Sequence, residues 1–242
     1  MTENNNFKMG LRDGIPICLG YISVSFAFGI FASGAGLSVL EATMISFFNL
    51  TSAGQLAAVP IIAAGGGYIE LILTQLVINL RYSLMSVSLS QRLGPSVRGG
   101  DRFAMAFANT DEIFAVSYSK EMPVGRRYFY GLMLTPMIGW TGGTLLGALA
   151  GNILPEIAVS ALGIAIYAML IAIFVPTSRD DSRVALCVLI SAALSCIFYF
   201  VPKLCDIPSG FVIVICSVSV SLIFAILCPV PDEAEEREVH DA

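Results

Sequence analysis

One apolar stretch contains the polar side chains that ligand recognition needs. Residues 74–85 read TQLVINLRYSLM, and Gln75, Asn79 and Arg81 interrupt an otherwise hydrophobic run. A full charge at bilayer depth costs at least about 2.5–3.5 kcal/mol, so such residues usually line a protein interior or a water-filled cavity. A guanidinium can bind a carboxylate through two hydrogen bonds, and amides supply neutral hydrogen bonds. The stretch therefore predicts a binding site.

Two other apolar runs contain polar groups of complementary chemistry. The run 39–64 has Asn49, Ser52 and Gln55 near its middle, and the run 103–120 has Asp111 and Glu112. The carboxyl groups can bind an ammonium group or transfer a coupling proton, since burial favours the protonated form of a carboxyl. The neutral residues either contact the ligand or hydrogen-bond neighbouring helices together.

Helical periodicity divides the polar residues of the stretch between two directions. At 100° per residue, Gln75, Asn79, Tyr82 and Ser86 fall on one stripe of a helix, and Arg81 lies roughly 200° from Asn79. Either the helix breaks near Asn79, or Arg81 serves a second neighbour. Three roles stay open for Arg81: a structural ion pair with one of the two acids, direct contact with the ligand, or extension to the membrane interface.

The elements that position these residues are membrane helices. Of the 242 residues, 56% are hydrophobic and 13% are charged, with a mean hydropathy of +0.81. Soluble domains have about 25% charged residues. Several runs of roughly 20 apolar residues can cross a hydrocarbon core of about 30 Å, and the short alternating segments of a β-barrel are not seen. We predict an all-α, polytopic integral protein of the inner (plasma) membrane with about six to eight membrane segments.

The charge distribution defines three parts. Residues 1–13 form a polar cytoplasmic head, 14–228 a transmembrane domain, and 229–242 an acidic, disordered cytoplasmic tail. The tail has six acidic residues and one Arg, so residues 1–231 have 12 acidic and 12 basic residues and are neutral. This balance gives no indication of nucleic-acid binding. The first apolar run has no cleavage pattern at its end, which predicts a retained span.

The sequence does not favour an enzyme. His240, in the tail, is the only histidine, and none of the six cysteines forms a C-x-x-C pair. Metal sites and Ser–His chemistry therefore have no candidate residues in the membrane domain. The GGG of residues 65–67 lacks the rest of a phosphate-binding loop. We expect no cofactor, no metal and no ATP hydrolysis.

Two runs leave the number of crossings open. The spans 14–36, 68–90, 128–150, 157–176, 184–201 and 210–228 are clear. The run 39–64 is either a broken helix or a kinked one, with Gly54 and Pro60 as the weak points. The run 103–120 is a short span, a re-entrant segment or an interfacial helix. Placing the Lys- and Arg-rich linkers inside gives six crossings if both runs dip without crossing, and eight if both cross.

Several passages resemble one family. Ser25–Gly29 (SFAFG), Ser52–Gln55 (SAGQ), Ile78–Met85 (INLRYSLM) and Asp111–Phe114 (DEIF) are similar to motifs of the AzlC family, the large subunit of two-component branched-chain amino-acid permeases. The resemblance implies transport, as an exporter, of valine, leucine or isoleucine with a small AzlD-like membrane subunit. We expect the proton gradient to drive it. An intramembrane enzyme and a non-transporting scaffold subunit are the alternatives.

Overall fold

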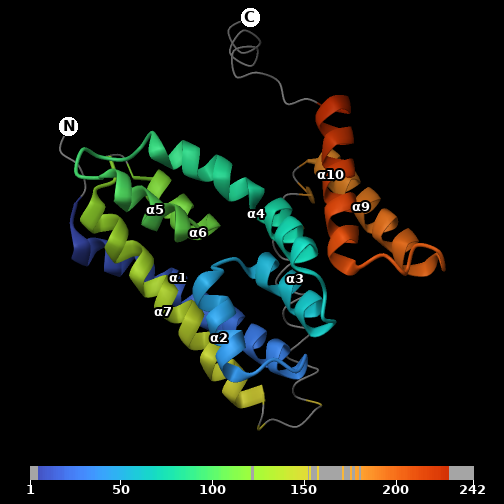
Figure 1. Cartoon of the computed structure of the whole chain (residues 1–242). Helices are drawn as coiled ribbons and strands as arrows, with labels where there is room; N and C mark the ends of the chain where they lie inside the picture. The colour runs from blue at the N-terminus through green and yellow to red at the C-terminus, as the bar shows by residue number, and fades with distance from the viewer. Residues whose placement is uncertain are drawn as a thin grey trace, which may run out of the picture. The chain divides into compact units, whose positions relative to one another are not determined.

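The computed structural model describes residues 5–120, 123–151 and 181–228, together with residues 153, 157, 171, 175, 178 and 179. Within this part of the chain, five helices are long and apolar enough to cross a membrane. The chain divides into two units, residues 1–170 and 171–242, which Figure 1 shows and which are described separately below. The predicted all-α, polytopic class is confirmed. The expected span 157–176 lies mostly outside the described residues, and the acidic tail lies entirely outside them.

The first unit is built on two parallel helices in close backbone contact, α1 (Phe7–Gly34) and α7 (Arg126–Gly151). A Cβ added to Gly10 would lie 2.1 Å from the Tyr128 carbonyl oxygen, and one added to Gly147 would lie 2.0 Å from that of Phe26. Glycine permits this approach because it has no side chain. The contacts run in the same order along both helices, so α1 and α7 begin at the same end of the unit.

Helix α1 begins within the segment expected to be a polar head. Its N-cap is Asn6, whose Oδ1 accepts a hydrogen bond from the Lys8 backbone N–H at 3.0 Å. A capped start satisfies backbone donors that would otherwise lack partners, so the helix extends seven residues before the apolar run starts at Gly14.

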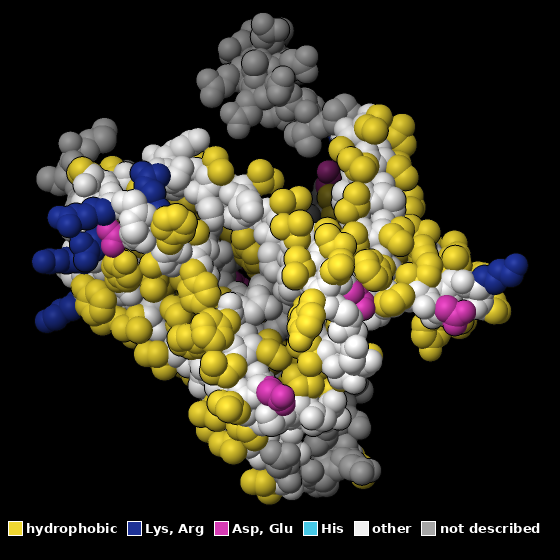
Figure 2. Space-filling model, viewed as in Figure 1, with side chains coloured by type: hydrophobic (Ala, Val, Ile, Leu, Met, Phe, Trp, Pro, Cys, Tyr) yellow, Lys and Arg dark blue, Asp and Glu magenta, His cyan; other side chains and the backbone are white. Residues whose placement is uncertain are grey.

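Helix α4 (Tyr68–Ser90) runs in the opposite direction. Just after its end, the Arg92 carbonyl accepts a hydrogen bond from the Val124 N–H at 2.8 Å, directly before α7 begins. The end of α4 and the starts of α1 and α7 therefore lie together. We call this the basic end, because Figure 2 shows dark-blue side chains gathered there. Its basic residues are Lys8, Arg12, Arg92, Arg98, Arg102, Lys120, Arg126 and Arg127.

The run 39–64 is a re-entrant hairpin that enters from the opposite end. It consists of α2 (Val39–Phe48) and α3 (Ser52–Ala63), separated by residues 49–51. In one continuous helix, Ser46 and Gln55 would be about 13 Å apart along the axis. Instead the Ser46 Oγ donates to the Gln55 Oε1 at 3.0 Å, so the chain turns back. Of the two alternatives for this run, the structure shows the broken helix, with the break before Gly54 and with Pro60 inside α3.

The run containing Asp111 is a second re-entrant hairpin, and it enters from the basic end. It consists of α5 (Gly99–Phe107) and α6 (Asp111–Tyr118). Near the start of α5, Asp101 pairs with Arg126 of α7 at 3.2 Å. At the end of α6, the Arg92 guanidinium lies 4.5 Å from the centroid of the Tyr118 ring. Both ends of the hairpin therefore lie at the basic end.

In the first unit, α1, α4 and α7 are long and apolar enough to cross a membrane, and each hairpin begins and ends at the same end of the unit. This is the arrangement that the six-crossing alternative requires of this part of the chain. The second unit contains α9 (Ser182–Phe200) and α10 (Ser209–Leu227), which pack against each other.

Candidate functional site

The first tip is the link between α2 and α3, residues 49–51. Its local sequence ends one helix and starts another: the Asn49 N–H still donates to the Ile45 carbonyl at 2.8 Å. The Thr51 Oγ1 then caps α3 by accepting from the Gly54 N–H at 3.2 Å. Ser and Thr oxygens are favoured at this position because they satisfy the free donors of a helix start.

Helix α4 binds the first tip through two amide side chains. The Gln75 Nε2 donates to the Gly54 carbonyl at 2.8 Å. The Gln75 Oε1 accepts from both Asn49 Nδ2 and Asn79 Nδ2, each at 3.2 Å. A Cβ added to Gly54 would lie 2.7 Å from the Gln75 Oε1, so a larger residue would displace this amide. Gln75, Asn79 and Asn49 thus form one network, as the shared stripe predicts for the first two.

The second side of the first tip is held by α7. The Ser46 and Thr144 hydroxyls lie 2.6 Å apart, and both residues are fully buried. Gln55, also fully buried, keeps an unpartnered Nε2, and the Oδ1 of Asn79 has no partner either. Buried polar atoms without partners are rare in folded proteins. Donors and acceptors are therefore available beside this tip for a ligand or water. Ser52, the first residue of α3, is half-buried.

The second tip is the link between α5 and α6, residues 108–110. The Thr110 Oγ1 caps α6 by accepting from the Ile113 N–H at 3.4 Å, and the Asn109 Nδ2 donates to the Ser86 Oγ of α4 at 3.0 Å. Tyr21 of α1 donates its hydroxyl to the Thr110 Oγ1 at 2.7 Å and to Glu112. The structure thus places Glu112 beside α1, at the start of α6.

Arg81 reaches the second tip. Its Nη2 lies 2.7 Å from the Asp111 Oδ2 and 3.2 Å from the Tyr82 hydroxyl, to which it donates. The side chains of Arg81 and Asp111 are 49% and 44% exposed, respectively. Helix α4 is continuous through this region, so the alternative of a break near Asn79 is wrong. The other alternative is confirmed: Arg81 serves a second neighbour.

The two tips therefore meet α4 at different heights. The first tip's network includes Asn79, and the second tip contacts Ser86. These two residues are seven positions apart, which is roughly 10 Å along a helix axis. Tyr82 lies between them. The first turn of α3 contains no acidic residue, whereas that of α6 contains Asp111 and Glu112. Helix starts are partially positive, and acidic side chains therefore offset this charge at the start of α6 and not at the start of α3.

Several residues of this site were not predicted. The residues that contact or adjoin the network without having been predicted are Tyr21, Ser46, Thr110, Thr144 and Trp140. The Trp140 ring centroid lies 4.9 Å from that of Tyr21. Thr110 had a signal, since a Thr directly before an acidic pair is typical of a helix start. The described residues include no group of three or more metal-ligating side chains, so a metal centre has no support there.

Comparison with known proteins assigns the family. A family model described as AzlC protein matches residues 16–154, which include both hairpins, α4, α7 and most of α1. An inner membrane protein of Escherichia coli, YgaZ, is 28% identical over 94% of each chain. An uncharacterized membrane protein of Archaeoglobus fulgidus is 32% identical over 74% of this chain and 79% of its own.

A third relative has a functional name. The branched-chain amino acid transport protein AzlC of Bacillus subtilis is 22% identical over 60% of this chain and 58% of its own. No solved structure matches the chain. Since the family model matches more than half of its residues, this multi-pass membrane protein, with two opposed hairpins meeting the polar face of one helix, belongs to the AzlC family.

Proposed function

We propose that the chain is a secondary transporter that exports branched-chain amino acids such as valine, leucine and isoleucine. One observation supports this most: two re-entrant tips enter from opposite ends and meet the same polar segment of α4. Broken helices whose ends point to a site inside the membrane are typical of transporters. The transport function in the name of the Bacillus subtilis relative supports the substrate class.

The chemistry between the tips suits a zwitterion with an apolar side chain. In this proposal the substrate carboxylate binds at the start of α3, where the Gln55 Nε2 is an unpartnered donor. The ammonium group binds at the start of α6, beside Glu112 and Asp111. The contacts of the two tips with Asn79 and Ser86 lie roughly 10 Å apart along α4, a separation that suits one amino acid. Because the zwitterionic substrate has no net charge, the free-energy cost of placing it at bilayer depth is lower than for an ion.

The two hairpins provide the gates in this proposal. Withdrawal of the second hairpin opens the site toward the basic end, and withdrawal of the first opens it toward the other end. The positive-inside rule places the basic end in the cytoplasm. The Arg81–Asp111 pair then closes the cytoplasmic gate, and protonation of Asp111 or Glu112 is the coupling step. A small AzlD-like membrane subunit completes the transporter.

An export assay tests the proposal. Cells expressing the chain with its candidate partner are loaded with leucine or valine from a dipeptide, and intracellular amino acid is followed with and without a protonophore. We expect faster loss of the amino acid than in cells without the chain, and a protonophore should abolish the difference. Unchanged intracellular valine and leucine in the expressing cells would refute export.

Two further arms separate the alternatives. Flux from the purified chain reconstituted alone would exclude a scaffold whose pathway lies in the partner. Asn79→Ala should reduce flux, whereas Ser83→Ala, on the exposed side of the same helix, should leave it unchanged. Equal flux in both variants would exclude the first tip as the binding site.

A further inference from the structure

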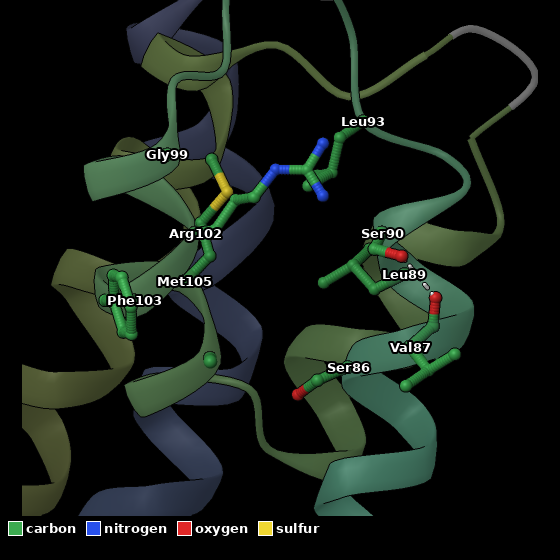
Figure 3. A pocket seen from close by; sticks show the side chains of 10 residues that line it. Ser86, Val87, Leu89, Ser90, Leu93, Gly99, Arg102, Phe103 and Met105 are labelled. Atoms are coloured by element: carbon green, nitrogen blue, oxygen red, sulfur yellow. Dashed lines mark hydrogen bonds between the residues drawn. The ribbon is translucent and has the colours of Figure 1, made fainter.

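A cavity lies between the end of α4 and α5, on the side of the proposed site that faces the basic end. It has a volume of about 510 Å³, which exceeds the volume of one free amino acid. Figure 3 shows its walls: Leu89 and Leu93 on one side, with Phe103 and Met105 on the other. The cavity is distinct from the proposed binding site, because none of the residues of the first tip lines it.

The cavity combines apolar walls with one cation. Leu89 and Met105 are buried, and Phe103 is 83% exposed at the mouth. The Arg102 guanidinium extends across the opening toward Leu93 (Figure 3). Within the part of the chain that the structure describes, Arg102 forms no ion pair. A lone guanidinium beside an apolar cavity is complementary to a molecule with one carboxylate and one branched aliphatic side chain.

The cavity is connected to the second tip. Ser86 lines it and also accepts a hydrogen bond from Asn109, whose Oδ1 has no partner and which is 3% exposed. The same helix turn thus lines the cavity and contacts the hairpin that closes the proposed site. A molecule bound in the cavity would therefore lie next to the Ser86–Asn109 contact of the second tip.

We propose that this cavity is an entry subsite for the substrate on the cytoplasmic side. Arg102 binds the carboxylate, and Leu89, Leu93 and Met105 enclose the side chain. The ammonium group, which is on the same carbon as the carboxylate, remains at the open mouth. This inference rests on the proposed transport function and adds a first stop on the path from the cytoplasm to the second tip.

Transport measured separately from each side of the membrane distinguishes an entry subsite from a central binding site. Uptake of labelled leucine is measured in inside-out and right-side-out membrane vesicles from cells expressing the full chain. Arg102→Ala should raise the KM about tenfold in inside-out vesicles, where the cytoplasmic side is exposed, because a charged hydrogen bond to the carboxylate is lost. The KM in right-side-out vesicles should stay unchanged. Arg102→Lys should show an intermediate KM, since Lys keeps the charge and loses the planar fork.

Arg98→Ala is the matched control. Arg98 is an exposed arginine four residues earlier that does not line the cavity, so its KM should equal that of the wild type on both sides. An Arg102→Ala KM equal to that of Arg98→Ala, or an equal rise on both sides, would overturn the entry subsite.

A binding measurement distinguishes failure of this inference from failure of the transport proposal. In a cysteine-free background, Phe103→Cys places a thiol at the mouth, and leucine should slow its alkylation by a maleimide. Protection without any flux would keep the subsite and refute transport. Flux without protection would refute the subsite. Alkylation that responds to anionic lipid and not to leucine would show that the cavity holds a lipid headgroup instead.

Discussion

At the scale of single residues, the polar side chains of α4 are shared between two partners. Gln75 and Asn79 bind the first tip, whereas Arg81 and Ser86 contact the second. Periodicity predicted that Arg81 points away from Asn79. The Arg81–Asp111 pair is about half exposed, and exposed pairs contribute only about 0–1 kcal/mol to stability. An interaction of this kind is better suited to opening and closing than to holding the fold together.

Arg81→Ala is therefore expected to separate transport from folding. Export should fall severalfold, since loss of an ion pair worth about 0–1 kcal/mol weakens closure of the gate by a factor of up to about five. The yield of folded protein in detergent should change little, as judged by gel filtration. A combined Arg81→Ala, Asp111→Asn and Glu112→Gln variant should stay inactive. Restored flux in that variant would show that the charges only neutralise each other.

The missed residues show where prediction from the sequence ends. Gln75, Asn79 and Arg81 stand out because amides and charges are costly in an apolar run. Ser46 and Thr144 do not stand out, since isolated hydroxyls are common in membrane helices. Their importance comes from lying 2.6 Å apart across 98 residues of sequence. Such a pairing depends on the tertiary fold.

At the scale of elements, glycine spacing determines which helices touch. On α7, Gly139, Gly143 and Gly147 recur every four residues and form one face, against which α1 packs by its backbone. Gly142 lies on another face, where an added Cβ would meet nothing within 4 Å. The five glycines of residues 131–147 are visible in the sequence, but they do not identify the helix against which they pack. The break in residues 39–64 was predictable from polar residues, whereas the return of the chain was not.

The two glycine faces give a matched pair of variants. Gly147→Ala should lower the free energy of unfolding by about 1–3 kcal/mol, because the rigid Phe26 backbone cannot move away from the added methyl. Gly142→Ala should be neutral or slightly stabilising, since alanine favours the helix more than glycine. Thermal melting of the detergent-solubilised protein, followed by gel filtration, measures both. Equal melting temperatures would contradict the close α1–α7 contact.

At the scale of the whole molecule, the two opposed hairpins determine the topology. The sequence allowed six or eight crossings, because hydropathy cannot distinguish a short span from a segment that turns back. In the first unit the contacts at Arg92, Arg126 and Asp13 favour hairpins that do not cross, since they join the ends of both α4 and the second hairpin to the starts of α1 and α7. All eight basic residues of the basic end then lie on one side, as the positive-inside rule requires.

Single-cysteine labelling in a cysteine-free background checks this arrangement. Cysteines at Arg98 and Arg126 should react with an impermeant maleimide only in inside-out vesicles. Cysteines at Gly36 and Gly67, in the loops at the opposite end, should react in intact cells. Labelling of position 98 from outside would favour eight crossings and reject the re-entrant hairpins.

The first hairpin also has a consequence for biosynthesis. Its two arms of 10 and 12 residues are each about half the length that inserts into a membrane as a span. The polar tip between them would be left facing lipid if it entered early. Its partners appear later: Gln75 with α4, the second crossing helix, and Thr144 only when α7 is made. The nascent chain must therefore leave residues 39–64 unburied until more than half of the protein has been synthesised.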